Sequence, residues 1–270
     1  MTEFADIEDG KLAYTRDGSG APLLCLHGGM GVDAGTLRVP GVVGLADRGC
    51  EVVVFDQRGH GDSSRVAGSG YTHELWATDA RRLAQHLGWN RFTLLGHSYG
   101  GFIALEYAIR WPQTLRSLIL VSTSAGPVST AAPAYATDGE VRDYFAGRWP
   151  GLFVGSDKHW EVFDQLRFSV GPYAAAFARE LPVYDLRTTV HGISVPVLLI
   201  VGSEDHYKSE MEWLADKLPN ASLHVFPKVG HMPFLEAPGL FRQTVSAFLS
   251  SIPSWAKTTV GPTKRSGRVT

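Results

Sequence analysis

Cysteine is scarce in this sequence, which has only Cys25 and Cys50 among its 270 residues. A small scaffold stapled by disulfides needs many more cysteines, so that class of protein is excluded. Both residues lie in apolar, strand-like runs, and we expect two buried thiols in the reduced state.

Long apolar runs and an excess of basic charge are also absent. No run approaches the roughly 18 consecutive apolar residues of a membrane helix, and the acidic first residues lack the apolar core of a secretory signal. The formal net charge is −2 without a basic stripe, which argues against a nucleic-acid partner. We therefore expect a cytoplasmic protein that binds neither membranes nor nucleic acid.

Metal-ligand patterns are missing as well. The ten histidines show no H-x-x-x-H pair and no clustering with cysteine, so we predict no metal site and no cofactor. Nothing in the sequence indicates the oligomeric state.

What the sequence does have is an alternation of apolar runs with helical patterns. Short, continuously apolar runs suit a parallel sheet that is covered on both faces, and their alternation with helices predicts a doubly wound α/β fold. A hairpin over 4–15 is expected to add an antiparallel edge. The strands are predicted at 22–26, 51–55, 92–95, 117–121, 196–201 and 221–226, and the main helices at 74–87, 100–110 and 240–249.

Residues 126–190 break this alternation, because they lack a strong strand run and contain aromatic, helix-like pieces. We predict that they form a helical cap over the sheet. The helix-like pieces lie at 143–145, 160–168 and 173–180; the predicted core comprises 1–125 and 191–252, and the polar residues 253–270 are expected to be a disordered tail.

The stretch L-C-L-H-G-G-M-G-V-D-A over 24–34 supports two interpretations. Gly29-x-Gly31-x-x-Ala34 fits a dinucleotide-binding turn, and Asp56 follows Ala34 by 22 residues, close to the expected ribose ligand. That interpretation needs a helix amino terminus at the turn, which the proline and glycines that follow disfavour. As His-Gly-Gly after a strand, the same residues fit an oxyanion loop.

A G-x-S-x-G motif places Ser98 between Gly96 and Gly100, where a predicted strand meets a predicted helix. This is the context of a nucleophile elbow, in which the glycines permit a tight turn that exposes the serine Oγ. The helix amino terminus favours developing negative charge, and the backbone N–H of Tyr99 is expected to donate to an oxyanion.

A serine nucleophile needs a base and an orienting carboxylate, and with a nucleophile elbow their chain order is serine, acid, histidine. Asp205 follows the strand at 196–201 in a Gly-x-x-Asp turn, whereas the strand at 117–121 ends without an acid. His231 follows the last predicted strand by a short loop. We therefore predict a triad of Ser98, Asp205 and His231.

Other polar residues near these motifs are expected to support loops rather than to react. His97 precedes the predicted nucleophile and is expected to help position the elbow. The residues expected to brace neighbouring loops are His27, Asp56, Arg58 and Asp62, and His60 lies in the same glycine-rich loop as Arg58.

Over about residues 10–250, these motifs together resemble the α/β-hydrolase superfamily. They are H-G-G-M-G from His27, D-Q-R-G-H-G-D-S from Asp56, G-H-S-Y-G-G from Gly96, G-S-E-D ending at Asp205 and G-H ending at His231. The first two look most like the proline iminopeptidase branch, which removes amino-terminal residues from peptides with a Ser-Asp-His triad.

The resemblance implies that acidic cap residues hold the amino group of the substrate. The candidates in this chain are Asp138, Glu140, Asp143, Asp157, Glu161 and Asp164. The nucleophile motif is G-H-S-Y-G-G where typical members of that branch have G-G-S-W-G, and G-H-S-x-G-G is equally at home in esterases, lactonases and carbon–carbon bond hydrolases.

The sequence thus predicts a serine hydrolase that cleaves an ester or amide bond of a small, largely apolar substrate or a short peptide. Gly29, or Met30 in its place, is expected to supply a second oxyanion N–H beside that of Tyr99. Two alternatives of another class stay open: an NAD-binding oxidoreductase and a non-catalytic receptor with the same fold.

Overall fold

The computed structural model describes residues 1–66, 70–127 and 132–252, so the predicted tail at 253–270 lies outside the described residues. At its centre is an eight-stranded sheet with the order β1-β2-β4-β3-β5-β6-β7-β8. The first hairpin is antiparallel and the strands from β4 to β8 pair in parallel, as predicted. The strands are β1 (Glu3–Ile7), β2 (Gly10–Gly18), β3 (Ala21–Leu26), β4 (Cys50–Phe55), β5 (Phe92–His97), β6 (Leu115–Val121), β7 (Val197–Gly202) and β8 (Ala221–Phe226).

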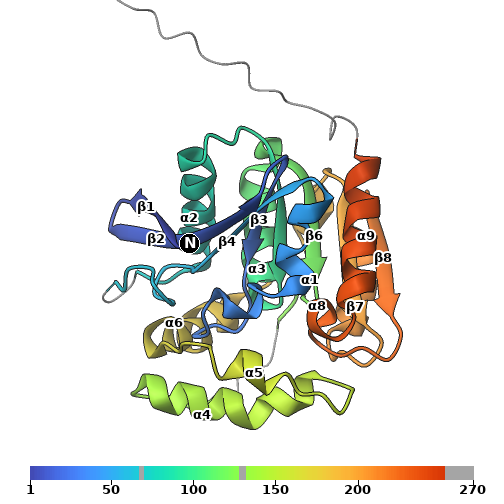
Figure 1. The fold of residues 1–270 in the computed structure, drawn as a ribbon. Coiled ribbons are helices and arrows are strands. Elements are labelled where there is room, and N and C mark those ends of the chain that lie inside the picture. Colours follow the sequence, from blue (N-terminus) through green and yellow to red (C-terminus); the bar gives the residue numbers. More distant parts are fainter. Residues whose placement is uncertain (67–69, 128–131, 253–270) are drawn as a thin grey trace, which may run out of the picture.

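Helices cover both faces of this sheet (Figure 1). The helices α2 and α3 pack together on one face, and α1, α8 and α9 pack together on the other. None of the described helices has both the length and the apolar character that crossing a bilayer requires. Their bounds are α1 (Pro40–Val43), α2 (His73–His86), α3 (Tyr99–Arg110), α4 (Asp138–Arg148), α5 (Trp160–Phe163), α6 (Val170–Ala175), α7 (Lys208–Lys217), α8 (Pro233–Glu236) and α9 (Pro238–Ser251).

The two faces of the sheet carry separate apolar cores. Along β3, Leu24 and Leu26 belong to the core under α2 and α3, while Leu23 and Cys25 belong to the core under α1 and α9. Successive side chains of a strand point to opposite faces, so a continuously apolar run is the pattern that a strand covered on both sides requires. Cys25 and Cys50 are buried and free, as predicted.

The segment between β6 and β7 contains α4, α5 and α6, which form a layer beyond the carboxyl ends of the strands (Figure 1). The helix α4 starts at Asp138, earlier than the predicted piece at 143–145, because Thr137 and Glu140 form a capping box at its amino terminus. An isolated antiparallel bridge between Val32 and Phe168 joins this layer to the loop after β3. The division into core and cap domains stays a prediction.

Candidate active site

Ser98 occupies a strained turn between β5 and α3. Its φ is +53° and its ψ −120°, a backbone conformation that residues with a side chain rarely adopt. The flanking glycines are required by space: a Cβ at Gly96 would lie 2.4 Å from the Gly100 oxygen, and one at Gly100 would lie 2.3 Å from the Leu26 oxygen. The turn is therefore possible only because both positions lack a side chain.

Two hydrogen bonds to the carboxyl end of β6 and the residues after it hold this turn. The Ser98 amide donates to the Val121 oxygen at 2.9 Å, and the Thr123 hydroxyl donates to the Ser98 oxygen at 2.8 Å. Tyr99 is the first residue of α3, so its N–H has no intrahelical acceptor and lies at the positive end of the helix dipole. The local geometry is that of a nucleophile elbow.

Asp205 and His231 come from the loops after β7 and β8 and meet at hydrogen-bond distance. His231 Nδ1 lies 3.1 Å from Asp205 Oδ1 and 3.2 Å from Oδ2, and both residues are buried. The Tyr207 amide also donates to Asp205 at 3.0 Å. Burial by itself would raise the pKa of Asp205, but the neighbouring His231 and these hydrogen bonds hold that pKa below its ordinary value. The carboxylate is therefore ionised at neutral pH.

A second histidine, which the sequence did not single out, shares this carboxylate. His206 Nδ1 lies 3.2 Å from Asp205 Oδ1, and its ring stacks on that of His231 with centroids 4.9 Å apart. The three residues bring potential metal-ligand atoms within 4.8 Å of one another. Sequence spacing did not reveal this group, because its members come from two loops; the absence of a metal stays a prediction.

A cavity of about 450 Å³ connects the predicted residues. Ser98, Tyr99, Gly29, Met30 and His231 all line it, whereas Asp205 is not among the residues that line it. The volume is in the range of sites for small molecules. Most of the wall is apolar and much of it is aromatic, with Phe102, Tyr144, Phe145, Trp149, Phe163, Phe168 and Phe177 among the lining residues.

The loop after β3 turns through two glycines with positive φ, Gly29 at +67° and Gly31 at +94°. The Gly31 amide donates to His60 Nε2 at 3.0 Å and is therefore engaged. In the described part of the chain, the amides of Gly29 and Met30 have no protein acceptor, so both stay candidates for an oxyanion donor. Only the three-residue 3₁₀ turn Ala34–Thr36 follows, so the helix that a dinucleotide-binding turn needs is missing.

Asp56 braces this loop, as predicted. Its carboxylate accepts hydrogen bonds from the amides of Ala34 and Asp62, both at 3.0 Å, and lies 3.1 Å from Arg38 Nη2. His27 links the loop after β3 to the loop after β4, because its Nε2 accepts a hydrogen bond from the Gln57 amide at 3.2 Å. A carboxylate occupied in this way is not available as a ribose ligand.

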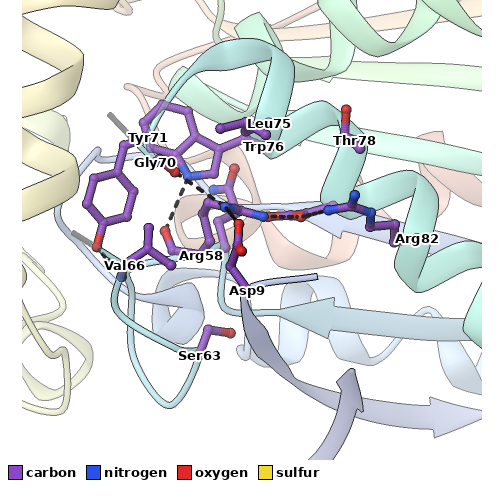
Figure 2. Close-up of polar contacts among 12 residues, drawn as sticks. Asp9, Arg58, Ser63, Val66, Gly70, Tyr71, Leu75, Trp76, Thr78 and Arg82 are labelled. Carbon is purple, nitrogen blue, oxygen red and sulfur yellow. Dashed lines mark hydrogen bonds and ion pairs between the residues drawn. The ribbon is translucent and has the colours of Figure 1, made fainter. Parts of the chain in front are cut away.

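Arg58 is a buried structural residue (Figure 2), with a side chain only 1% exposed. Its Nε lies 2.5 Å from Asp79 Oδ2 and its Nη2 2.8 Å from Oδ1, a two-point ion pair to α2. The Trp76 indole donates to the Arg58 oxygen at 3.2 Å. Asp62 from the same loop pairs instead with Arg167, in the segment between β6 and β7. Both contacts confirm a bracing role.

The side chain of His97 has a partner that the sequence did not reveal, while its role in positioning the elbow stays a prediction. Its Nε2–H donates to the backbone oxygen of His231 at 3.0 Å, so it supports the loop of the predicted base and also lines the cavity. Burial lowers the pKa of His97 to about 3, and the ring is neutral at pH 7. The partner lies 134 residues away in the sequence, which is why the sequence alone did not reveal this contact.

The acidic residues of the predicted cap do not reach the cavity. Of the six candidates, none is among the lining residues. Asp138 instead binds Arg65 and the Val170 amide, Glu140 caps α4, and Asp164 lies near Arg142. Asp157 and Glu161 flank His159 on the surface, and Asp143 lies beside Arg142.

Comparison with known proteins agrees with this geometry. A model of the Alpha/beta hydrolase family matches residues 23–244. The chain belongs to the α/β hydrolase family. This α/β hydrolase is 27% identical to a proline iminopeptidase of Lactobacillus delbrueckii subsp. lactis, over 86% of this chain and 90% of that protein. It is 30% identical to a 2-hydroxymuconate semialdehyde hydrolase of Pseudomonas putida, over 86% and 88%.

Solved structures of related hydrolases are also similar to this α/β hydrolase. A structure of an esterase from Exiguobacterium antarcticum superimposes with a TM-score of 0.79 at 26% identity, covering 93% of this chain and all of that one. The relatives thus include a peptidase, an esterase and a semialdehyde hydrolase.

Proposed function

We propose that this α/β hydrolase cleaves carboxylic esters, including lactones, through a covalent acyl-enzyme. Ser98 is the nucleophile, His231 the base and Asp205 the residue that orients His231. The observation that carries the proposal is the strained Ser98 turn in the same cavity as a histidine that is paired with a buried carboxylate.

In the first step Ser98 Oγ attacks the ester carbonyl while its proton passes to His231 Nε2. Asp205 accepts a hydrogen bond from Nδ1–H, which fixes the tautomer with a free Nε2 and stabilises the imidazolium. The backbone N–H groups of Tyr99 and Gly29 donate to the tetrahedral oxyanion, with Met30 as the alternative second donor. One such donor contributes about 10²–10³-fold to turnover.

The imidazolium then returns its proton to the departing alkoxide, and the C–O bond breaks. In the second step His231 deprotonates a water molecule that attacks the acyl-enzyme, and the same N–H groups hold the second oxyanion. Ser98 regains its proton when the carboxylic acid leaves. No cofactor is required for any of these steps.

An aminopeptidase is the second candidate, favoured by the relatives named proline iminopeptidase. Such an enzyme needs a carboxylate for the substrate's amino group. The predicted cap carboxylates do not line the cavity, and Glu210 of α7 is the carboxylate that does among the described residues. Carbon–carbon bond cleavage, as in the semialdehyde hydrolase relative, would use the same serine and histidine.

The test is a panel of p-nitrophenyl esters, lactones and aminoacyl p-nitroanilides, assayed with the wild type and Ser98→Ala. We expect ester or lactone turnover that falls by roughly 10⁶-fold in Ser98→Ala, as when other serine hydrolases lose their nucleophile. A fluorophosphonate probe should label the wild type and leave Ser98→Ala unlabelled.

Circular dichroism and the unfolding midpoint of Ser98→Ala serve as the folding control. Retained hydrolysis in a folded Ser98→Ala would overturn the proposal, and so would an unlabelled wild type, the outcome for a non-catalytic receptor. Turnover of free aminoacyl anilides with no ester hydrolysis would replace it with the aminopeptidase.

A further inference from the structure

One arginine and one glutamate line the cavity within the described ranges of the chain. Arg148 is the last residue of α4, and Glu210 lies in the first turn of α7. Their neighbours differ, and these neighbours determine whether the cavity is better suited to bind an anionic or a cationic group of a ligand.

Glu210 already has partners. Its Oε2 accepts a hydrogen bond from the Ser124 hydroxyl at 2.9 Å. The Arg187 side chain passes close by: a Cβ built on Gly126 would lie 3.0 Å from Arg187 Cδ and 3.5 Å from Glu210 Oε2. Because Glu210 already accepts a hydrogen bond and lies near a guanidinium, a ligand cation would gain little from pairing with it.

Arg148 has no carboxylate within 4.0 Å among the residues that the structure describes. Its guanidinium carbon lies 4.9 Å from the centre of the Tyr144 ring, and the adjoining wall is made of aromatic side chains such as Phe145 and Trp149. Arg148 is exposed, so water solvates its guanidinium in the free protein, and an anion in the cavity can pair with it without displacing another carboxylate.

The charge of Arg148 reaches the catalytic end of the cavity. After burial and His231, Arg148 is among the causes that lower the pKa of His206, the ring stacked on His231. Both Arg148 and His206 line the same cavity. Because Ser98 and Arg148 line the same cavity, an acyl chain attached to Ser98 can extend toward this guanidinium.

We infer that the substrate is an ester whose acyl group ends in a carboxylate, and that Arg148 binds this carboxylate. The planar guanidinium matches a carboxylate with two parallel hydrogen bonds. The apolar wall accommodates the methylene chain between the two ends. This inference rests on the proposed ester hydrolysis and specifies its substrate class.

The test uses mono-p-nitrophenyl esters of straight-chain dicarboxylic acids with four to eight carbons. Each is compared with the same ester whose free carboxylate is capped as a methyl ester, so that chain length is matched. For the best length we expect kcat/KM to favour the free acid by about ten- to hundredfold, the size of a charge-assisted hydrogen bond.

In Arg148→Gln this preference should disappear, because KM rises much more for the acid than for the methyl-capped ester of the same length. Arg179→Gln is the matched control. Arg179 is also exposed and also lies between β6 and β7, but it does not line the cavity. This variant should keep the preference for the acid.

A wild type that prefers the capped ester, or a preference that survives in Arg148→Gln, would overturn the inference. So would a preference for aminoacyl esters that is lost in Glu210→Gln. In all three outcomes esters are still hydrolysed, so the proposed function stands; loss of every ester activity would instead remove the proposed function.

Discussion

His206 lies nearly flat against His231, with ring centroids 4.9 Å apart and planes inclined by 25°. Both Nδ1 atoms approach the same oxygen of Asp205, at 3.2 Å from His206 and 3.1 Å from His231. His231 is buried and its amide donates to the Leu152 oxygen at 2.8 Å, whereas the His206 side chain is 64% exposed. A fixed ring is the better base, because its orientation needs no ordering before reaction.

The first prediction concerns this pair. His231→Asn should lose hydrolysis almost completely, whereas His206→Asn should keep kcat within about tenfold. The reason is that His231 is buried and bound to Asp205 and through its backbone to Leu152, while His206 is exposed. Steady-state kinetics on one p-nitrophenyl ester measure both. Equal losses in the two variants would show that His206 shares the role of base.

Asp205→Asn should lower kcat by about 10⁴-fold at pH 7 while leaving the fold intact. The amide nitrogen cannot accept from His231 Nδ1–H, so the ring takes the wrong tautomer. The comparison requires unchanged circular dichroism. A loss of less than tenfold would mean that Asp205 does not orient the base.

The buried pair of Arg58 and Asp79 predicts a non-additive effect on stability. Arg58→Met leaves Asp79 with only the longer contact to Arg82 at 3.7 Å, and Asp79→Leu leaves Arg58 with only Asp9 at 3.9 Å, so each single variant should lower the free energy of unfolding by up to about 3–5 kcal/mol. The double variant should cost less than the sum, because no charge is left behind. Urea unfolding measures all three, and strict additivity would contradict the pairing.

Stability should fall at acid pH because neutral histidines are buried. Burial lowers the pKa of His27 and of His60 to about 3, and the hydrogen bonds use each ring in its neutral form. From about pH 6.5 down to about 3 the unfolded chain binds protons that the folded chain does not. The free energy of unfolding is thus highest above pH 6.5 and decreases as the pH falls.

His60→Gln tests this linkage. It should reduce the slope of unfolding free energy against pH by up to about 1.4 kcal/mol per pH unit in that window, the value for one proton. His191→Gln, which changes an exposed histidine, is the control and should leave the slope unchanged. An equal slope in His60→Gln would refute a neutral buried His60.

The elbow predicts a contrast between two glycines. Gly100→Ala would place a Cβ 2.3 Å from the Leu26 oxygen and should cost about 1–3 kcal/mol of stability, with a large loss of hydrolysis. Gly147→Ala in α4 meets no atom within 4 Å and should stabilise by up to about 1 kcal/mol. Thermal unfolding and one ester assay check both variants.

The sequence determined most of the architecture, because strands buried on both faces must be continuously apolar and the long helices α2, α3 and α9 show the helical period, whereas α7 was not predicted. All six predicted parallel strands are present, and the motifs place Ser98, Asp205 and His231 at strand ends in the family's order. Periodicity and turn chemistry are local properties, so a sequence carries them without knowledge of neighbours in space.

Only the tertiary structure decided which side chains meet. His97 contacts the His231 loop, His206 shares Asp205, and Arg148 lines the cavity while the carboxylates of the predicted cap do not. These contacts join segments that are distant in the chain, and they depend on the order of the strands and on where α4 ends. A residue's type indicates the interaction it needs, but sheet order and packing select the partner that supplies it.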